Sequence, residues 1–106
     1  MALSLIHAPA RATRGEVFEI RASIAHAMES GQRSDSQGRR MARDIIRRVE
    51  CRYAGELVFA ADLFPAIAAN PYLAFHTVAV VSGAISVRWS GDNGFEHGAS
   101  VDIEVA

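Results

Sequence analysis

The sequence contains one cysteine, Cys51, and no lysine among its 106 residues. A single cysteine excludes a disulfide within the chain, so no internal cross-link stabilises the fold. The eleven basic residues are all arginines, and they nearly balance the twelve acidic residues. Because the net charge is only −1, we expect no chain-wide electrostatic field that would attract nucleic acid.

Long apolar runs are also missing. No stretch approaches the ~18 apolar residues that a membrane-spanning helix needs, so no membrane association is predicted. The segment Met1–Ile6 is too short for a secretory signal and has no basic leader. Taken alone, these features predict a chain that is cytoplasmic or exported by another route.

The motifs of common catalytic sites are absent too. The sequence has no glycine-rich phosphate loop and no serine nucleophile elbow. Asp62, Glu29 and Asp35 form no recognisable acid–base pair. We therefore predict no catalytic residues and do not expect an enzyme.

What the sequence does contain is a series of short alternating runs separated by turn residues. This pattern predicts a single domain over residues 1–106, built as an all-β, immunoglobulin-like β-sandwich of about seven antiparallel strands. The half-apolar composition is sufficient for one core. The expected strands are 3–6, 16–25, 45–53, 56–63, 73–81, 84–90 and 95–105.

The alternation also predicts which side chains face inward, because successive residues of a strand point to opposite faces. Strand 73–81 is mostly apolar and is expected to be covered on both faces. Phe64–Asn70 is expected to form one helical or 3₁₀ turn. The hairpin turns are expected at Ala54-Gly55 and at Asp92-Asn93-Gly94. The expected inward residues are Phe18, Ile20, Ala22, Ile24, Val49, Cys51, Tyr53, Ile85, Val87, Trp89, Val101, Ile103 and Val105.

One segment, Met28–Asp44, has no usable period and is longer than most unstructured connections. Loops of this length are usually functional or disordered, so this is the first place to expect a partner. The arginines in and after it are Arg33, Arg39, Arg40, Arg43, Arg47 and Arg48. Arginine binds carboxylates and oxyanions, so an acidic partner or an anion such as thiosulfate is one interpretation. The other is a solvated, mobile loop.

Metal-binding residue types are present but are not arranged as ligands. The four histidines are His7, His26, His76 and His97. No histidine or methionine follows Cys51 within ten residues, as a blue-copper site in folds of this kind would require. We predict no metal and no cofactor. Cys51 is either a reactive thiol or an inert core residue, and its alternation away from Arg48 and Arg52 favours the core.

The segment His26–Arg33 resembles the histidine–proline–methionine–glutamate–threonine–glycine motif of the SoxZ family of bacterial sulfur oxidation. The similarity is most specific in Phe59–Leu63, Pro65–Ile67 and Ala69–Phe75, and it covers nearly the whole chain. Further matching residues are Ala42–Ile46, Val49–Tyr53, Trp89 and Ile103–Val105. The departures from the family pattern are Ala27, Ala54, Glu56, His76 and Thr77.

The resemblance implies a non-catalytic subunit that pairs with SoxY, which carries sulfur intermediates on a cysteine in a glycine-rich arm. The segment Asp102–Ala106 has neither cysteine nor glycine, so this chain is not expected to be the carrier. The implied partners are SoxY, in a heterodimer, and transiently other sulfur-oxidation enzymes. The implied location is the periplasm, after export with a partner that bears a twin-arginine signal.

The residues expected to bind the partner are His26, Met28, Glu29, Arg33, Asn70, Pro71 and Tyr72. Among these, Met28 and Tyr72 are expected to anchor the interface, because flexible and aromatic side chains dominate such contacts. Two alternatives remain. One is a divergent SoxZ-like protein or a generic immunoglobulin-like interaction module, not tied to thiosulfate. The other is a small redox or metal enzyme that uses Cys51 and the histidines.

Overall fold

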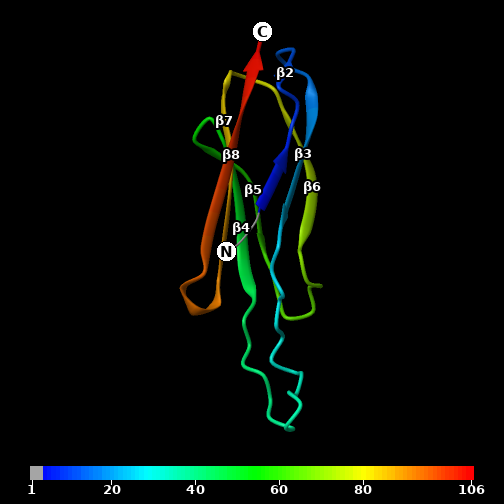
Figure 1. Cartoon of the computed structure of the whole chain (residues 1–106). Helices are drawn as coiled ribbons and strands as arrows, with labels where there is room; N and C mark the ends of the chain where they lie inside the picture. The colour runs from blue at the N-terminus through cyan, green and yellow to red at the C-terminus, as the bar shows by residue number, and fades with distance from the viewer. Residues whose placement is uncertain (1–3) are drawn as a thin grey trace.

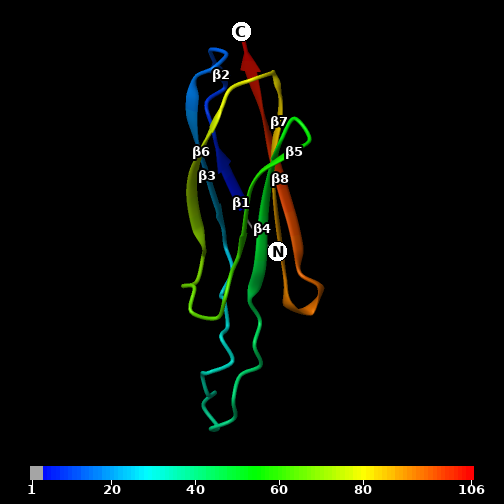
Figure 2. The same cartoon turned by 180° about the vertical axis from the view of Figure 1, so that it is seen from behind.

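The computed structural model describes residues 4–106, so Leu3, the predicted start of the first strand, lies outside it. The chain folds into two β-sheets that enclose one apolar core (Figures 1 and 2). A 3₁₀ turn, η1, spans Asp92–Gly94. The strands are β1 (Ser4–His7), β2 (Arg11–Ala12), β3 (Val17–Ile24), β4 (Ile46–Tyr53), β5 (Glu56–Asp62), β6 (Tyr72–Val78), β7 (Gly83–Gly91) and β8 (Glu96–Val105).

The smaller sheet has the order β1-β3-β6, and the larger one has the order β2-β8-β7-β4-β5. All pairings are antiparallel except that of β2 with β8. The predicted immunoglobulin-like β-sandwich is therefore confirmed. The two-residue strand β2 was not predicted, because two residues are too few to show a period.

Strand alternation produces the core. In β3 the residues that face inward are buried, while Val17 and Arg21 on the opposite face are exposed. β4 and β7 follow the same rule, with Cys51 and Trp89 at 0% and 1% exposure. Removing this much apolar surface from water is the main stabilising term of a fold of this size. The buried members are Phe18, Ile20, Ala22, Ile24, Met28, Ile45, Ile46, Val49, Cys51, Tyr53, Leu63, Ala79, Ile85, Val87, Trp89 and Ile103.

Strand β6 differs from its prediction. It ends at Val78, and no residue within it is buried, because β6 is an edge strand with one face in solvent. The predicted cover on both faces is therefore wrong. Beyond it the chain leaves the sheet: the amides of Val80 and Val81 each donate to the Tyr53 hydroxyl at 3.1 Å. Both valines are about half exposed.

The predicted turns lie where expected. Ala54 and Gly55 both adopt positive φ, 50° and 86°, as a tight hairpin turn requires. The segment 64–70 is not helical: it holds a turn closed by the Ile67 amide, which donates to the Phe64 carbonyl at 3.0 Å. Within residues 4–106, no helix is long and apolar enough to cross a membrane.

Candidate partner interface

The segment 25–45, called the arm below, is a hairpin-like extension that projects beyond one end of the sandwich (Figures 1 and 2). Glu29 and Asp44 exchange two backbone hydrogen bonds of 2.8 Å. Further out, the Met41 amide donates to the Arg33 carbonyl at 2.7 Å. The arm is thus held by its own backbone pairing, which its irregular composition did not reveal.

His26 and Asn70, two of the predicted partner-binding residues, connect the base of the arm to the β5–β6 loop. The His26 amide donates to Asn70 Oδ1 at 2.9 Å, and the Asn70 amide donates to the His26 carbonyl at 2.7 Å. The imidazole Nδ1 accepts the Met28 amide at 2.9 Å, and the ring stands edge-on to Phe95 with centroids 5.0 Å apart. His26 therefore stabilises the arm base through four contacts, made by its amide, its carbonyl, its Nδ1 atom and its ring.

Met28 lies inside the core at 5% exposure. Its sulfur accepts the amide of Ile46 at 3.2 Å, and its backbone has a positive φ of 52°. A non-glycine residue in this left-handed region is uncommon and costs free energy, which the surrounding contacts offset. The Met28 side chain therefore packs in the core beneath the arm base and is not on the surface.

Glu29 and Arg33 form an ion pair along the arm. Both Nε and Nη2 of Arg33 donate to Glu29 Oε1, at 3.1 and 2.7 Å. The hydrogen bond from Arg33 lowers the pKa of the Glu29 carboxyl. The Glu29 side chain is 15% exposed while that of Arg33 is 68% exposed. The Arg33 guanidinium thus binds Glu29 through Nε and Nη2, while the side chain remains largely exposed to solvent.

Asp92, expected from the sequence only as part of a turn, is a further residue at this end. Arg43 donates Nε to Oδ2 and Nη2 to Oδ1, both at 2.9 Å. The Ile45 amide donates to Oδ2 at 3.1 Å, and Arg47 lies 3.2 Å from Oδ1. The Arg43 hydrogen bond is the main reason that the pKa of Asp92 is lowered. Asp92 thereby ties the β7–β8 turn to the outgoing side of the arm.

These contacts divide the arginine cluster rather than leaving it as one positive patch. Arg33, Arg43 and Arg47 are paired as described, and Arg39 lies 3.4 Å from Asp35. The pairing argues against a single anion site formed by all six arginines. It also gives the arm ion pairs at several points along its length.

Pro71 and Tyr72 complete the predicted set. Pro71 is buried, and its carbonyl accepts the Ile24 amide at 3.2 Å. Tyr72 is 60% exposed on the outer face of the smaller sheet, opposite Ser23. Two further apolar residues, not among the predicted partner-binding set, lie in the β5–β6 loop: Phe64 and Ile67, at 65% and 38% exposure. The arm base thus adjoins an apolar surface that solvent can reach.

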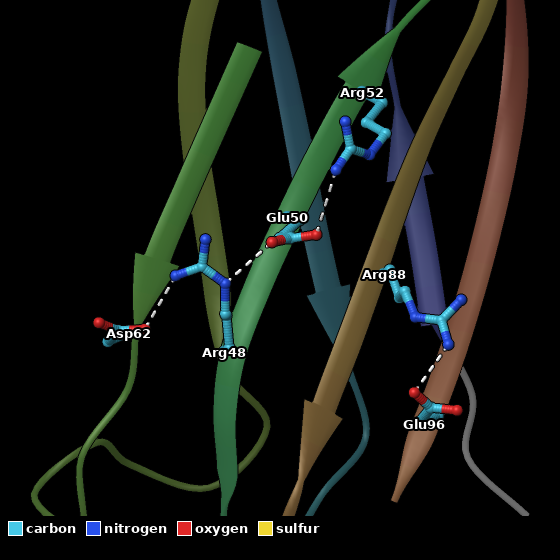
Figure 3. A network of polar contacts seen from close by, with 6 residues as sticks. All are labelled: Arg48, Glu50, Arg52, Asp62, Arg88 and Glu96. Carbon is cyan, nitrogen blue, oxygen red and sulfur yellow. Dashed lines mark hydrogen bonds and ion pairs between the residues drawn. The ribbon is translucent and has the colours of Figure 1, made fainter. Parts of the chain in front are cut away.

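The outer face of the larger sheet is different in character. Figure 3 shows its charged side chains, which come from four neighbouring strands. Arg48 bridges Glu50 at 2.9 Å and Asp62 at 3.0 Å. Pairs this exposed contribute little to stability, but they make the face polar. The other pairs drawn are Arg52–Glu50 at 3.7 Å and Arg88–Glu96 at 2.7 Å. An open hollow of about 380 Å³ lies between Glu50, Arg52, Ser86, Arg88, Gly98 and Ser100.

Cys51 is enclosed by the core, and burial raises the pKa of its thiol to about 11. A thiol that is buried and protonated is a poor nucleophile, because the thiolate is the reactive form. The inert-core interpretation of Cys51 thus agrees with the structure. Within the described residues 4–106, no three histidine, cysteine, aspartate or glutamate side chains converge as metal ligands do.

The fold defines the class of this protein: an all-β sandwich of the immunoglobulin-like type. Solved structures share it. A superoxide reductase (neelaredoxin) from Ignicoccus hospitalis matches with a TM-score of 0.76 at 18% identity, over 97% of this chain and 80% of that one. The CARDB domain of a Pyrococcus furiosus protein matches with a TM-score of 0.58 at 13% identity, over 100% and 88%.

The sulfur carrier protein SoxY from Chlorobium limicola f thiosulfatophilum has the same fold, with a TM-score of 0.68 at 12% identity over 97% of this chain and 78% of that one. At these identities the likeness is one of fold alone. No curated protein sequence matches significantly. The family model for the sulphur oxidation protein SoxZ matches residues 6–102, nearly the whole chain. This chain belongs to the SoxZ family.

Proposed function

We propose that this chain is the non-catalytic subunit that pairs with a SoxY subunit, and that the pair carries covalently bound sulfur intermediates in periplasmic thiosulfate oxidation. Membership of the SoxZ family supports a role in sulfur oxidation. In this proposal the chain reaches the periplasm together with a partner that bears the twin-arginine signal.

The observation that carries the proposal is the burial of the only cysteine. Covalent sulfur carriage needs an accessible thiolate. Cys51 is fully buried, and the pKa of its thiol is raised to about 11. A protein of this family that takes part in sulfur carriage must therefore rely on a thiol supplied by another chain.

Co-expression of this chain with a candidate SoxY subunit tests the proposal, followed by size-exclusion chromatography and native mass spectrometry. We expect a one-to-one complex that survives dilution. The variant Cys51→Ala should form it as well as the native chain does. If the chain stays alone beside several SoxY candidates, the proposal fails in favour of a divergent SoxZ-like protein or a generic interaction module.

The base of the arm is the proposed contact surface, and a matched pair of variants tests it. Tyr72 and Val17 lie near opposite ends of the same outer sheet face, at 60% and 62% exposure. Tyr72→Asp should weaken SoxY binding by about tenfold or more, because a charge would be buried in the contact. Val17→Asp should leave binding unchanged. Equal binding by both variants and the native chain would remove Tyr72 from the interface.

A further inference from the structure

One long side of the sandwich carries the edges of both sheets. β5 ends the larger sheet and β6 ends the smaller one. The two edges lie side by side, because Phe59 of β5 and Phe75 of β6 stack with centroids 4.2 Å apart and rings inclined by 8°. Both rings are only half-buried. This side of the core is therefore closed by the aromatic pair together with other partly buried residues of the two edges, such as Ala61 and Leu73, and has no strand outside it among residues 4–106.

The opposite side is protected. The edge of β8 is covered by β2, and Arg11 of β2 forms an ion pair with Glu104 at 3.1 Å. The remaining edge strand there, β1, has only four residues. Short edges, charges and covering segments are the means by which proteins prevent pairing with another chain.

β5 lacks most of these means. Its seven residues include no lysine, arginine or proline, and its two carboxylates, Glu56 and Asp62, stand at its ends. A bulge lies at Val58, between the pairs formed by Phe59 and Leu57. Beyond the bulge the register with β4 is regular from Phe59 to Asp62. The Leu63 amide extends the pairing by donating to the Arg47 carbonyl at 2.8 Å. The outer backbone groups of 59–63 have no partner among the described residues.

We infer that the β5 edge receives an extended strand of the SoxY subunit, which continues the larger sheet by one strand. The identity of the partner rests on the proposed function; the form of the contact rests on the edge. The free amides and carbonyls of the edge can hydrogen-bond only to a partner segment whose backbone is extended. Apolar contact alone would not require that conformation of the partner. Leu57, exposed at 47%, offers an apolar side chain beside the added strand.

The inferred contact continues onto the surface at the arm base. A strand paired over 59–63 alone would bury less than the ~800 Å² per partner that stable complexes usually bury. The β5–β6 loop follows directly and exposes Phe64 and Ile67. Asn70 then joins this loop to His26. The edge and the loop thus follow one another along the chain, and the inferred contact with a single partner includes both.

Hydrogen–deuterium exchange of the free chain and of the SoxY complex tests the inference directly. The outward amides of 59–63 should exchange quickly in the free chain and at least about tenfold more slowly in the complex, since pairing in a ladder protects them. Amides of the interior strand β7 serve as the control and should not change. A complex whose β5 amides remain unprotected would overturn the inference and leave the proposed function standing. Absence of any complex would overturn both.

A second measurement uses charge. Ala60 and Ala84 are both exposed on the outer face of the larger sheet, Ala60 on the β5 edge and Ala84 on the interior strand β7. Ala60→Lys puts on the β5 edge a lysine, the residue that natural edge strands use to prevent pairing with another chain. It should raise the Kd for SoxY by at least about tenfold. Ala84→Lys should change it by less than about twofold, because no strand can add there. Equal effects of the two lysines would contradict the inferred edge.

Discussion

Cys51 lies in the middle of β4 with no exposed surface, and burial raises the pKa of its thiol from the ordinary 9.0 to about 11. In the unfolded chain the thiol ionises at its ordinary pKa, so between pH 9.0 and 11 the unfolded state binds fewer protons than the folded one. Stability contributed by the buried thiol is therefore complete below pH 9.0 and falls as the pH rises to about 11.

We predict that Cys51→Ala removes this alkaline dependence. The variant should be less stable at neutral pH by about 1 kcal/mol, the usual cost of deleting a small buried group. Its loss of stability between pH 9.0 and 11 should be shallower than that of the native chain. Urea unfolding at several pH values measures both. Rapid reaction of the native thiol with a thiol reagent at neutral pH would contradict the buried placement.

Asp92 behaves in the opposite sense. Its hydrogen bonds from Arg43 and Ile45 lower the pKa of its carboxyl, so its stabilising contribution is present above the ordinary carboxyl pKa. That contribution is lost as the pH falls through the lowered pKa. We predict that Asp92→Asn lowers the thermal midpoint at pH 7 and makes the decline of stability below pH 4 shallower. Asp102→Asn, an exposed change in β8, is the control and should alter neither.

At the scale of elements, the close approach of the β7–β8 turn to the arm depends on Gly91. A Cβ at Gly91 would stand 2.3 Å from the Ile45 carbonyl oxygen and 2.7 Å from the Ile46 Cα. Both are backbone atoms and cannot move aside. At Gly98 an added Cβ would meet only the Val87 carbonyl oxygen, at an ordinary 3.5 Å.

We therefore predict that Gly91→Ala lowers the free energy of unfolding by about 3 kcal/mol or more, through overpacking. Gly98→Ala should change it by less than about 1 kcal/mol. Chemical denaturation of the two variants compares them. The prediction fails if both glycines tolerate alanine equally well.

The whole molecule is elongated, with extents of 59 × 19 × 18 Å and a radius of gyration of 16.2 Å. A compact domain of this length has a radius of gyration of about 13 Å. The arm accounts for much of the difference, because it projects along the long axis (Figure 1).

We predict that small-angle scattering from a dilute monomer gives a radius close to 16.2 Å. Replacement of residues 34–40 by Asn-Gly should shorten the particle and reduce the radius while the circular dichroism spectrum stays that of the native β-sandwich. A native radius near ~13 Å would instead mean that the arm lies folded against the sandwich.

The alternating runs were sufficient to predict the seven longer strands, the inward residues and the buried states of Cys51 and Trp89. Alternation is a local property, and the hydrophobic effect acts on it in the same way wherever a strand packs. Of the residues that the resemblance selected, His26, Asn70 and Tyr72 lie at the arm base, whereas Arg33 lies further out along the arm. Whether they bind a partner stays a prediction.

The tertiary structure decided what depends on contacts between distant segments. The apolar strand β6 has no buried residue because it took an edge position and its outer face is open to solvent, and its composition encodes neither. The arm is held to the sandwich because Glu29 pairs with Asp44 and because Asp92, 49 residues from Arg43, accepts hydrogen bonds from its guanidinium. The neighbouring edges of β5 and β6 follow from the order of strands in the two sheets. Sequence periodicity reports which face of a strand is buried, whereas strand neighbours and ion-pair partners are set by how the whole chain closes around its core.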